Sequence, residues 1–140
     1  MDAAEEIFRG GCLCGAVRYE ARGPATQLCF CHCETCRRAA GAPGVPWATF
    51  QVANFKLTKG ALAEYQSSPQ VVRGFCAQCG SSLTYRNSAR ATEIDVTPVT
   101  LDDPERLAPK AHIWMHDRLS WEVPGDSLPR FATKRTDGNS

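Results

Sequence analysis

The residues with the greatest chemical potential in this sequence are its eight cysteines, because a thiolate is both a metal ligand and a nucleophile. They form three groups along the chain: Cys12 and Cys14, then Cys29, Cys31, Cys33 and Cys36, then Cys76 and Cys79. In a cytosolic protein, this density indicates metal binding or catalysis more often than disulfides. A disulfide within a close pair would also be strained. We therefore expect metal sites, with zinc as the metal.

Cys76 and Cys79 have the spacing of a zinc knuckle. A tight turn aims both sulfurs at one point, and Gly80 directly after it permits left-handed backbone. Cys12 and Cys14 are flanked by glycines, so the backbone can bend and bring together two sulfurs that a flat strand would hold about 7 Å apart. Joined, the two pairs form a closed four-thiolate site, a kind of site that is usually structural.

The segment CFCHCETC, residues 29–36, is expected to hold a second site. Zinc binds sulfur at about 2.3 Å, so two thiolates on one ion lie about 3.8 Å apart. In a strand, Cys29 and Cys33 would be about 13 Å apart, which is too far for one ion. Cys31, Cys33 and Cys36 can converge if a strand ends near residue 32 and a helix follows. We expect these three to hold a catalytic zinc with an open fourth position, and Cys29 to be left out.

Other assignments of this segment stay open at the level of sequence. A closed structural site would need a fourth ligand, from Cys29 after a backbone kink or from His32, His112 or His116. Iron could take the place of zinc, although the C-x-C spacings do not match the iron–sulfur patterns. Arg37 and Arg38 follow the cluster, where they could bind a substrate carboxylate or form an exposed helix face.

The elements that position these cysteines are expected to be mostly short strands. Apolar and polar residues alternate in AVRYEA, WATFQV and SSLTYR, and Gly or Pro separates such runs. One short helix is expected at ETCRRAA, residues 34–40, and one further turn at LDDPERL. We predict a mostly β, sandwich-like fold as a single domain over residues 1–131, followed by a polar tail over residues 132–140.

Composition narrows the class of protein. The formal net charge is +1 and Lys and Arg are scattered, which argues against nucleic-acid binding. The N-terminus MDAAEEIFRG has no apolar run, and nowhere do 18 apolar residues occur together, so neither a secretory signal nor a membrane span is expected. A soluble, cytoplasmic protein is predicted.

Four blocks that carry these motifs closely resemble the GFA family, named for the glutathione-dependent formaldehyde-activating enzyme and including the domain of centromere protein V. The blocks span about residues 10–121 and read, in order, GGCLCGAVRYE, CHCETCRRAAGAP, FCAQCGSSLTY and VTLDDPERLAPKAHIWMHDRLSW. The resemblance implies a β-tent of folded sheets with two zinc ions per chain. It assigns Cys12, Cys14, Cys76 and Cys79 to the structural zinc and Cys31, Cys33 and Cys36 to the catalytic zinc; Cys29 has no counterpart.

The founding enzyme of that family condenses formaldehyde with glutathione into S-hydroxymethylglutathione. The resemblance therefore predicts a zinc-dependent carbon–sulfur lyase-type enzyme acting on adducts of a thiol, glutathione or similar, with a small aldehyde such as formaldehyde. Glutathione is a candidate co-substrate. The candidates for general acid or base are Tyr85, Asp95, His112 and His116. Two rival hypotheses are a non-catalytic, zinc-stabilised binding module for protein or nucleic acid, and a redox sensor in which Cys29 pairs with a zinc-site cysteine.

Overall fold

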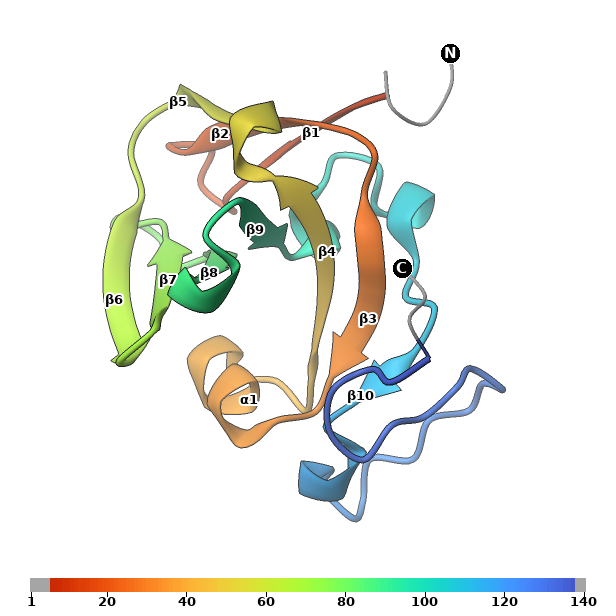
Figure 1. The fold of residues 1–140 in the computed structure, drawn as a ribbon. Coiled ribbons are helices and arrows are strands. Elements are labelled where there is room, and N and C mark those ends of the chain that lie inside the picture. The colour runs from red at the N-terminus through yellow and green to blue at the C-terminus, as the bar shows by residue number, and fades with distance from the viewer. Residues whose placement is uncertain (1–5, 138–140) are drawn as a thin grey trace.

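The computed structural model describes residues 6–137, which form two β-sheets and one α-helix (Figure 1). The smaller sheet has the order β1 (Ile7–Gly11), β2 (Arg18–Arg22), β5 (Phe55–Lys59). The larger sheet has the order β10 (His112–Ile113), β3 (Thr26–Cys31), β4 (Val45–Gln51), β9 (Glu93–Val96), β8 (Ser82–Asn87), β7 (Val71–Phe75), β6 (Ala63–Ser68). The predicted mostly β fold is confirmed.

The larger sheet bends, so that β3 and β4 lie across from β6 and β7, with α1 (Glu34–Ala40) near one end of the intervening space (Figure 1). Neighbouring strands are antiparallel except β10, which runs parallel to β3. The helix expected at residues 34–40 is present as α1. The turn expected at LDDPERL is a 3₁₀ turn at Pro104–Leu107. Further 3₁₀ turns occur at Val52–Asn54, Ser88–Arg90, Pro98–Thr100 and Met115–Asp117.

Alternation of buried and exposed side chains along the strands explains how the two sheets pack. In β2, Tyr19 and Ala21 are buried while their neighbours are more exposed. They join a core that includes Phe8 from β1 and Phe50 from β4, whose ring centroids are 5.7 Å apart. A second, smaller hydrophobic cluster contains Cys29, Cys31, Cys36, Val45 and Trp47. The cysteines of CFCHCETC thus lie in apolar surroundings of their own.

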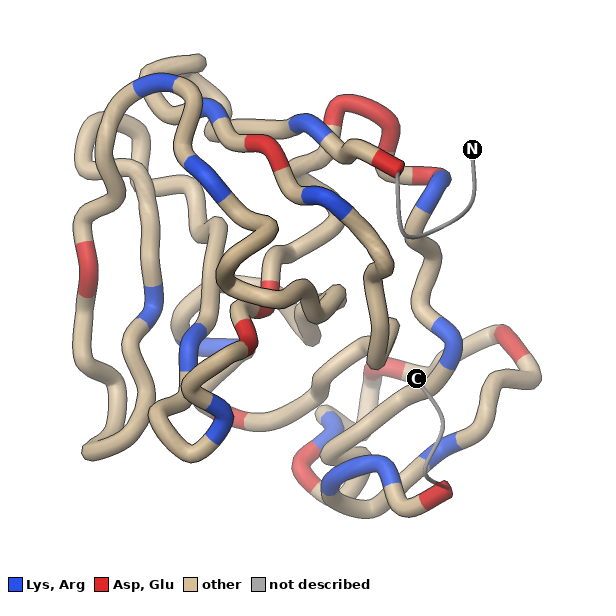
Figure 2. Tube along the Cα trace, turned by 45° about the horizontal axis from the view of Figure 1, so that its top comes forward, with Lys and Arg blue, Asp and Glu red and all other residues tan. Residues whose placement is uncertain are grey.

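Charged residues are distributed over the described part of the chain. Lys and Arg positions lie near Asp and Glu positions in both the upper and the lower parts of the view (Figure 2). No helix among residues 6–137 is long and apolar enough to cross a membrane.

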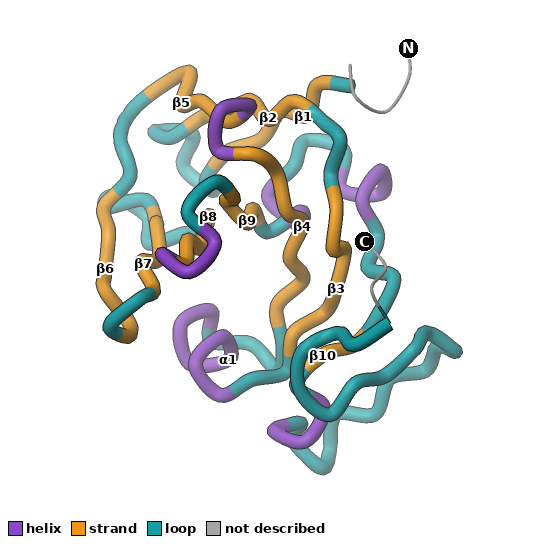
Figure 3. The backbone as a smooth tube through the Cα atoms, viewed as in Figure 1, coloured by secondary structure: helices purple, strands orange, loops and turns teal. Residues whose placement is uncertain are grey.

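The chain after β10 runs mostly as loop, yet it is held in place by backbone hydrogen bonds (Figure 3). Phe131 N–H donates to His112 O at 2.9 Å, and Trp114 N–H donates to Thr133 O at 2.9 Å. The segment that we expected to be a polar tail therefore begins as a strap packed along residues 112–116. The ends of the predicted domain and tail, residues 1–5 and 138–140, lie outside the described residues.

Candidate active site and metal centres

The sulfurs of Cys12, Cys14, Cys76 and Cys79 all lie within 4.8 Å of one another. Cys12 Sγ is 3.7 Å from Cys14 Sγ, which is 3.8 Å from Cys76 Sγ. These separations match the edge of about 3.8 Å in a tetrahedron of thiolates around zinc. The four residues therefore fit a closed metal site that joins two parts of the chain 62 residues apart.

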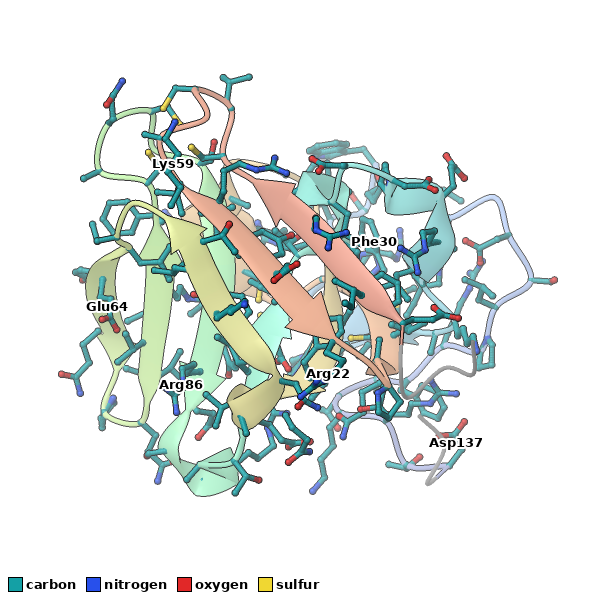
Figure 4. The ribbon with its side chains drawn as sticks, turned by 90° about the horizontal axis from the view of Figure 1, so that it is seen from above. Arg22, Phe30, Lys59, Glu64, Arg86 and Asp137 are labelled. Carbon is teal, nitrogen blue, oxygen red and sulfur yellow. The ribbon has the colours of Figure 1, made fainter. Side chains whose placement is uncertain are left out.

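Local backbone geometry builds this four-cysteine cluster. The first pair lies between β1 and β2, at the end of the small sheet near Lys59 and opposite the end near Arg22 (Figure 4). The second pair lies between β7 and β8, where Gly80 has φ of 79° and donates its N–H to Cys76 O at 2.8 Å. That positive φ is the left-handed conformation for which the sequence required a glycine.

A hydrogen bond prepares one thiol of this cluster for metal binding. The hydroxyl of Ser81 lies 3.2 Å from Cys79 Sγ and lowers the pKa of Cys79 to about 5. Cys79 is therefore a thiolate at neutral pH, which is the form that binds zinc.

Cys31, Cys33 and Cys36 form a separate cluster with sulfurs within 4.8 Å of one another. Cys31 ends β3, while Cys33 caps the N-terminus of α1 and its Sγ accepts the Cys36 N–H at 3.4 Å. Among residues 6–137, no fourth His, Cys, Asp or Glu joins the cluster. The strand-to-helix bend thus brings together the three cysteines that the spacing suggested, and Cys29 is not among them.

The three thiols change one another's pKa values through hydrogen bonds. Hydrogen bonds with Cys31 and Cys36 lower the pKa of Cys33 to about 2, and the hydrogen bond with Cys33 raises the pKa of Cys31. The pKa shifts thus favour ionisation of Cys33 over that of Cys31. The donor set, three soft sulfurs within 4.8 Å of one another, fits zinc with one position left for another ligand.

None of the three histidines closes this site. His32 is fully buried, and its Nε2 lies 2.9 Å from His112 Nδ1. His112 Nε2 in turn lies 2.9 Å from a carboxylate oxygen of Asp126. His116 is 61% exposed and pairs with Asp117. The sequence-level alternative of a histidine as fourth ligand therefore finds no support in the geometry.

Arg73 contacts the three-cysteine cluster from β7. Its Nη1 and Nη2 both lie 3.7 Å from Cys36 Sγ, and Nη2 also donates to Thr35 Oγ1 at 3.2 Å. The guanidinium lies over the ring of Tyr85, 5.1 Å from its centroid, and the residue is only 7% exposed. Three thiolates and a divalent ion carry one net negative charge, which this buried cation offsets.

We expect Arg73→Met to weaken zinc binding at the three-cysteine site by about 10- to 100-fold, because outer partners of metal ligands contribute that much to affinity. Methionine keeps most of the side-chain volume and removes the charge. Competition between the protein and a chromophoric chelator measures the affinity of each zinc separately. Arg86→Met, on the neighbouring strand β8 and exposed, is the matched control. Equal zinc affinities in Arg73→Met and wild type would contradict this role.

A cavity of about 610 Å³ lies beside the three-cysteine cluster. Its lining includes Cys31, Cys33 and Cys36, whereas the four cysteines of the closed cluster do not line it. Cys29, Trp47 and Tyr85 also line it, and the ring centroids of Trp47 and Tyr85 are 5.6 Å apart. The cavity is thus lined by aromatic rings and by four cysteines, three of which form the cluster.

Two of the four candidates for proton transfer line this cavity, Tyr85 and Asp95, whereas His112 and His116 do not. Asp95 is buried and accepts a hydrogen bond from Thr49 Oγ1 at 2.7 Å. Loss of hydration raises the pKa of Asp95, and an ion pair with Arg90 at 3.0 Å opposes that shift. Burial likewise raises the pKa of Tyr85.

The cations of the cavity are not the ones that the sequence suggested. Arg38 is 79% exposed and pairs with Glu34, and neither Arg37 nor Arg38 lines the cavity. The cations that do line it are Arg73, Arg90, Lys134 and Arg135. These four are distant in sequence from CFCHCETC. The sequence held one signal for them: Arg73 lies among the apolar residues of VVRGF, which indicates a buried arginine.

The protein belongs to a class of mostly β proteins with two candidate metal sites. One is a closed four-cysteine cluster, and the other is a three-cysteine cluster on a cavity. Residues 7–117 match the family model of the glutathione-dependent formaldehyde-activating enzyme, and the chain belongs to this family. The resemblance inferred from the four sequence blocks is therefore confirmed.

Individual proteins are also similar to this chain. A protein of Schizosaccharomyces pombe described as an uncharacterized lyase is 32% identical over 78 residues, which are 56% of this chain and 56% of that protein. The chain thus matches about half the length of this curated relative. The crystal structure of a Rhodobacter sphaeroides protein superimposes with a TM-score of 0.58 at 22% identity, covering 87% of this chain and 98% of that one. The latter likeness supports the fold.

Proposed function

We propose that the protein is a zinc-dependent, lyase-type enzyme that makes and breaks a carbon–sulfur bond in adducts of a thiol with a small aldehyde. The observation that carries this proposal is the cluster of Cys31, Cys33 and Cys36 on a cavity of about 610 Å³, without a fourth protein ligand among residues 6–137. Membership of the family and the lyase description of the yeast relative support a lyase-type activity. Formaldehyde is the proposed aldehyde, and glutathione or a similar thiol the proposed partner.

Zinc bound by the three cysteines would lower the pKa of a substrate thiol and hold its sulfur as the nucleophile or leaving group. The protein supplies the rest of the site. Arg73 offsets the charge of the sulfurs, and the rings of Trp47 and Tyr85 form an aromatic wall beside the position of the small aldehyde. In the cleavage direction, the adduct's hydroxyl loses its proton as the C–S bond breaks, which gives the aldehyde and the thiolate.

We propose that Asp95 accepts that proton. It is the buried carboxylate of the cavity, and its raised pKa moves toward the range in which a group exchanges protons near neutral pH. Asp95 would accept the hydroxyl proton in cleavage and return it in synthesis.

We expect Asp95→Asn to lower kcat by about 100-fold or more, because a positioned general base contributes that much to a rate. Asparagine keeps the shape of the side chain and can still accept the hydrogen bond from Thr49. In the cleavage direction, the wild-type rate should rise with pH as Asp95 loses its proton. This rise should be absent from the pH profile of the variant. Glu93→Gln, the other acidic partner of Arg90, is the control. A wild-type pH profile in Asp95→Asn would contradict the assignment.

The function itself is tested by magnetisation-exchange NMR between free thiol and its formaldehyde adduct, with zinc-loaded and chelator-stripped protein. We expect zinc-loaded protein to accelerate the exchange for at least one thiol and stripped protein to leave it at the uncatalysed rate. Equal rates in the two samples for every thiol tried would contradict the proposal.

The rival hypotheses receive less support. A nucleic-acid module needs a basic face, whereas the charges of residues 6–137 are interspersed (Figure 2). A redox sensor needs a reactive thiolate, but burial raises the pKa of Cys29 to about 12. Cys29 therefore stays protonated at neutral pH.

A further inference from the structure

The C-terminal strap, residues 129–135, places two cations at the cavity. Backbone hydrogen bonds fix the strap immediately before them: Met115 N–H donates to Phe131 O at 3.0 Å, and Trp114 N–H donates to Thr133 O at 2.9 Å. Lys134 and Arg135 follow directly and both line the cavity. They lie beyond residue 117, where the match to the family model ends. This part of the cavity is therefore contributed by sequence that the family match does not cover.

Arg135 has one hydrogen-bonding group that nothing in the described structure satisfies. Its Nε and Nη2 donate to the two carboxylate oxygens of Asp137, at 2.7 and 3.1 Å. Its Nη1 is buried and has no partner within the part of the chain that the structure describes. The side chain is 15% exposed, so bulk water cannot readily replace the missing acceptor. A buried N–H of a charged group requires an acceptor, which makes Arg135 a binding group for a ligand oxygen.

Two other cations of the cavity, Arg73 and Arg90, already have partners, and Lys134 is exposed. Arg73 donates to Cys36 and Thr35, and Arg90 forms ion pairs with Glu93 and Asp95. Among these three arginines, Arg135 is the one with a buried guanidinium nitrogen that has no partner within residues 6–137. A guanidinium prefers a carboxylate as acceptor, since its planar set of N–H groups matches two oxygens.

We propose that Arg135 binds a carboxylate of the substrate, and that the enzyme therefore prefers thiols that carry a carboxylate over neutral thiols. This inference rests on the proposed function, because it requires the thiol sulfur to lie at the three-cysteine cluster. The groups that would bind the two ends of such a substrate line the same cavity: the three cysteines for the sulfur and Arg135 for the carboxylate. Arg135 acts on specificity and takes no part in the bond-breaking step.

The test compares two thiols of the same size, 3-mercaptopropionate and its neutral amide, 3-mercaptopropanamide. Calorimetric titration of zinc-loaded protein gives the Kd of each, independently of turnover. We expect wild type to bind the acid about 10- to 100-fold more tightly than the amide, the range expected for a hydrogen bond to a charged group. Arg135→Gln should bring the two Kd values together by weakening the acid alone, and Arg135→Lys should restore part of the preference.

Arg38→Gln is the matched control, since it removes the same charge from an exposed arginine that does not line the cavity. It should keep the wild-type preference, and the inference is overturned if it loses the preference as Arg135→Gln does. An unchanged ratio of Kd values in Arg135→Gln, or equal weakening of both thiols, would also overturn the role of Arg135 while leaving the proposed function in place. If neither thiol binds to zinc-loaded wild type, both proposals fail.

Discussion

Cys36→Ser is expected to lose one of two zinc ions per chain and to lower the rate of adduct cleavage by about 1,000-fold, while the fold persists. Cys36 is 3% exposed and contacts both Cys31 and Cys33, so its loss leaves two sulfurs, too few to hold the ion at a catalytic site. The ion's stabilisation of developing negative charge amounts to several kcal/mol, and each 1.36 kcal/mol corresponds to a factor of ten in rate. The separate four-cysteine cluster still ties the scaffold together.

Elemental analysis of zinc per chain, combined with the NMR exchange rate, measures both expected losses. Cys29→Ser is the matched control, because Cys29 is also a buried cysteine that lines the cavity but lies outside the cluster. It should keep both ions and most of the rate. Full turnover by a Cys36→Ser protein that has lost one zinc would show that the three-cysteine site is not catalytic.

Cys76→Ser is expected to have the largest effect on stability. Cys76 is 1% exposed and belongs to the closed cluster that links the turn after β1 to the turn after β7. Structural zinc contributes its binding free energy to folding, and the linked residues Cys14 and Cys76 are 62 positions apart. A loss of several kcal/mol would lower the melting temperature by on the order of 15 °C in a chain of this size.

Thermal unfolding followed by circular dichroism measures this shift. Leu13→Ser, between two ligands of the same cluster and 89% exposed, should melt near the wild-type temperature. Excess chelator should bring wild type toward the melting temperature of Cys76→Ser. An unchanged melting temperature in Cys76→Ser would mean that the closed cluster does not stabilise the fold.

The sequence predicted those features that depend on local pattern. Alternation of apolar and polar residues identified the strands, and the helix at Glu34–Ala40 followed from its composition and from the glycine after it. The two cysteine clusters also followed from spacing, because the distance between two sulfurs is limited by how far the backbone can bend between them.

The missed features depend on contacts between distant parts of the chain. Arg73 lies 37 positions from Cys36, and nothing near either residue in sequence links them. Arg37 and Arg38, chosen for their proximity in sequence, lie on α1 but do not line the cavity. Residues 132–140 were predicted to form a polar tail, but backbone hydrogen bonds from Trp114 and His116 hold Thr133 and Ala132 in place. Such bonds leave no compositional signal.

The most direct test of the central claim is the sulfur coordination of zinc, measured by X-ray absorption with and without added 3-mercaptopropanamide. One four-sulfur and one three-sulfur site predict an average of about 3.5 sulfurs per zinc, rising to about 4 when the thiol is added. This neutral thiol probes the open position without involving Arg135. An average of four sulfurs before any thiol is added, or no change when it is added, would contradict the open three-cysteine site.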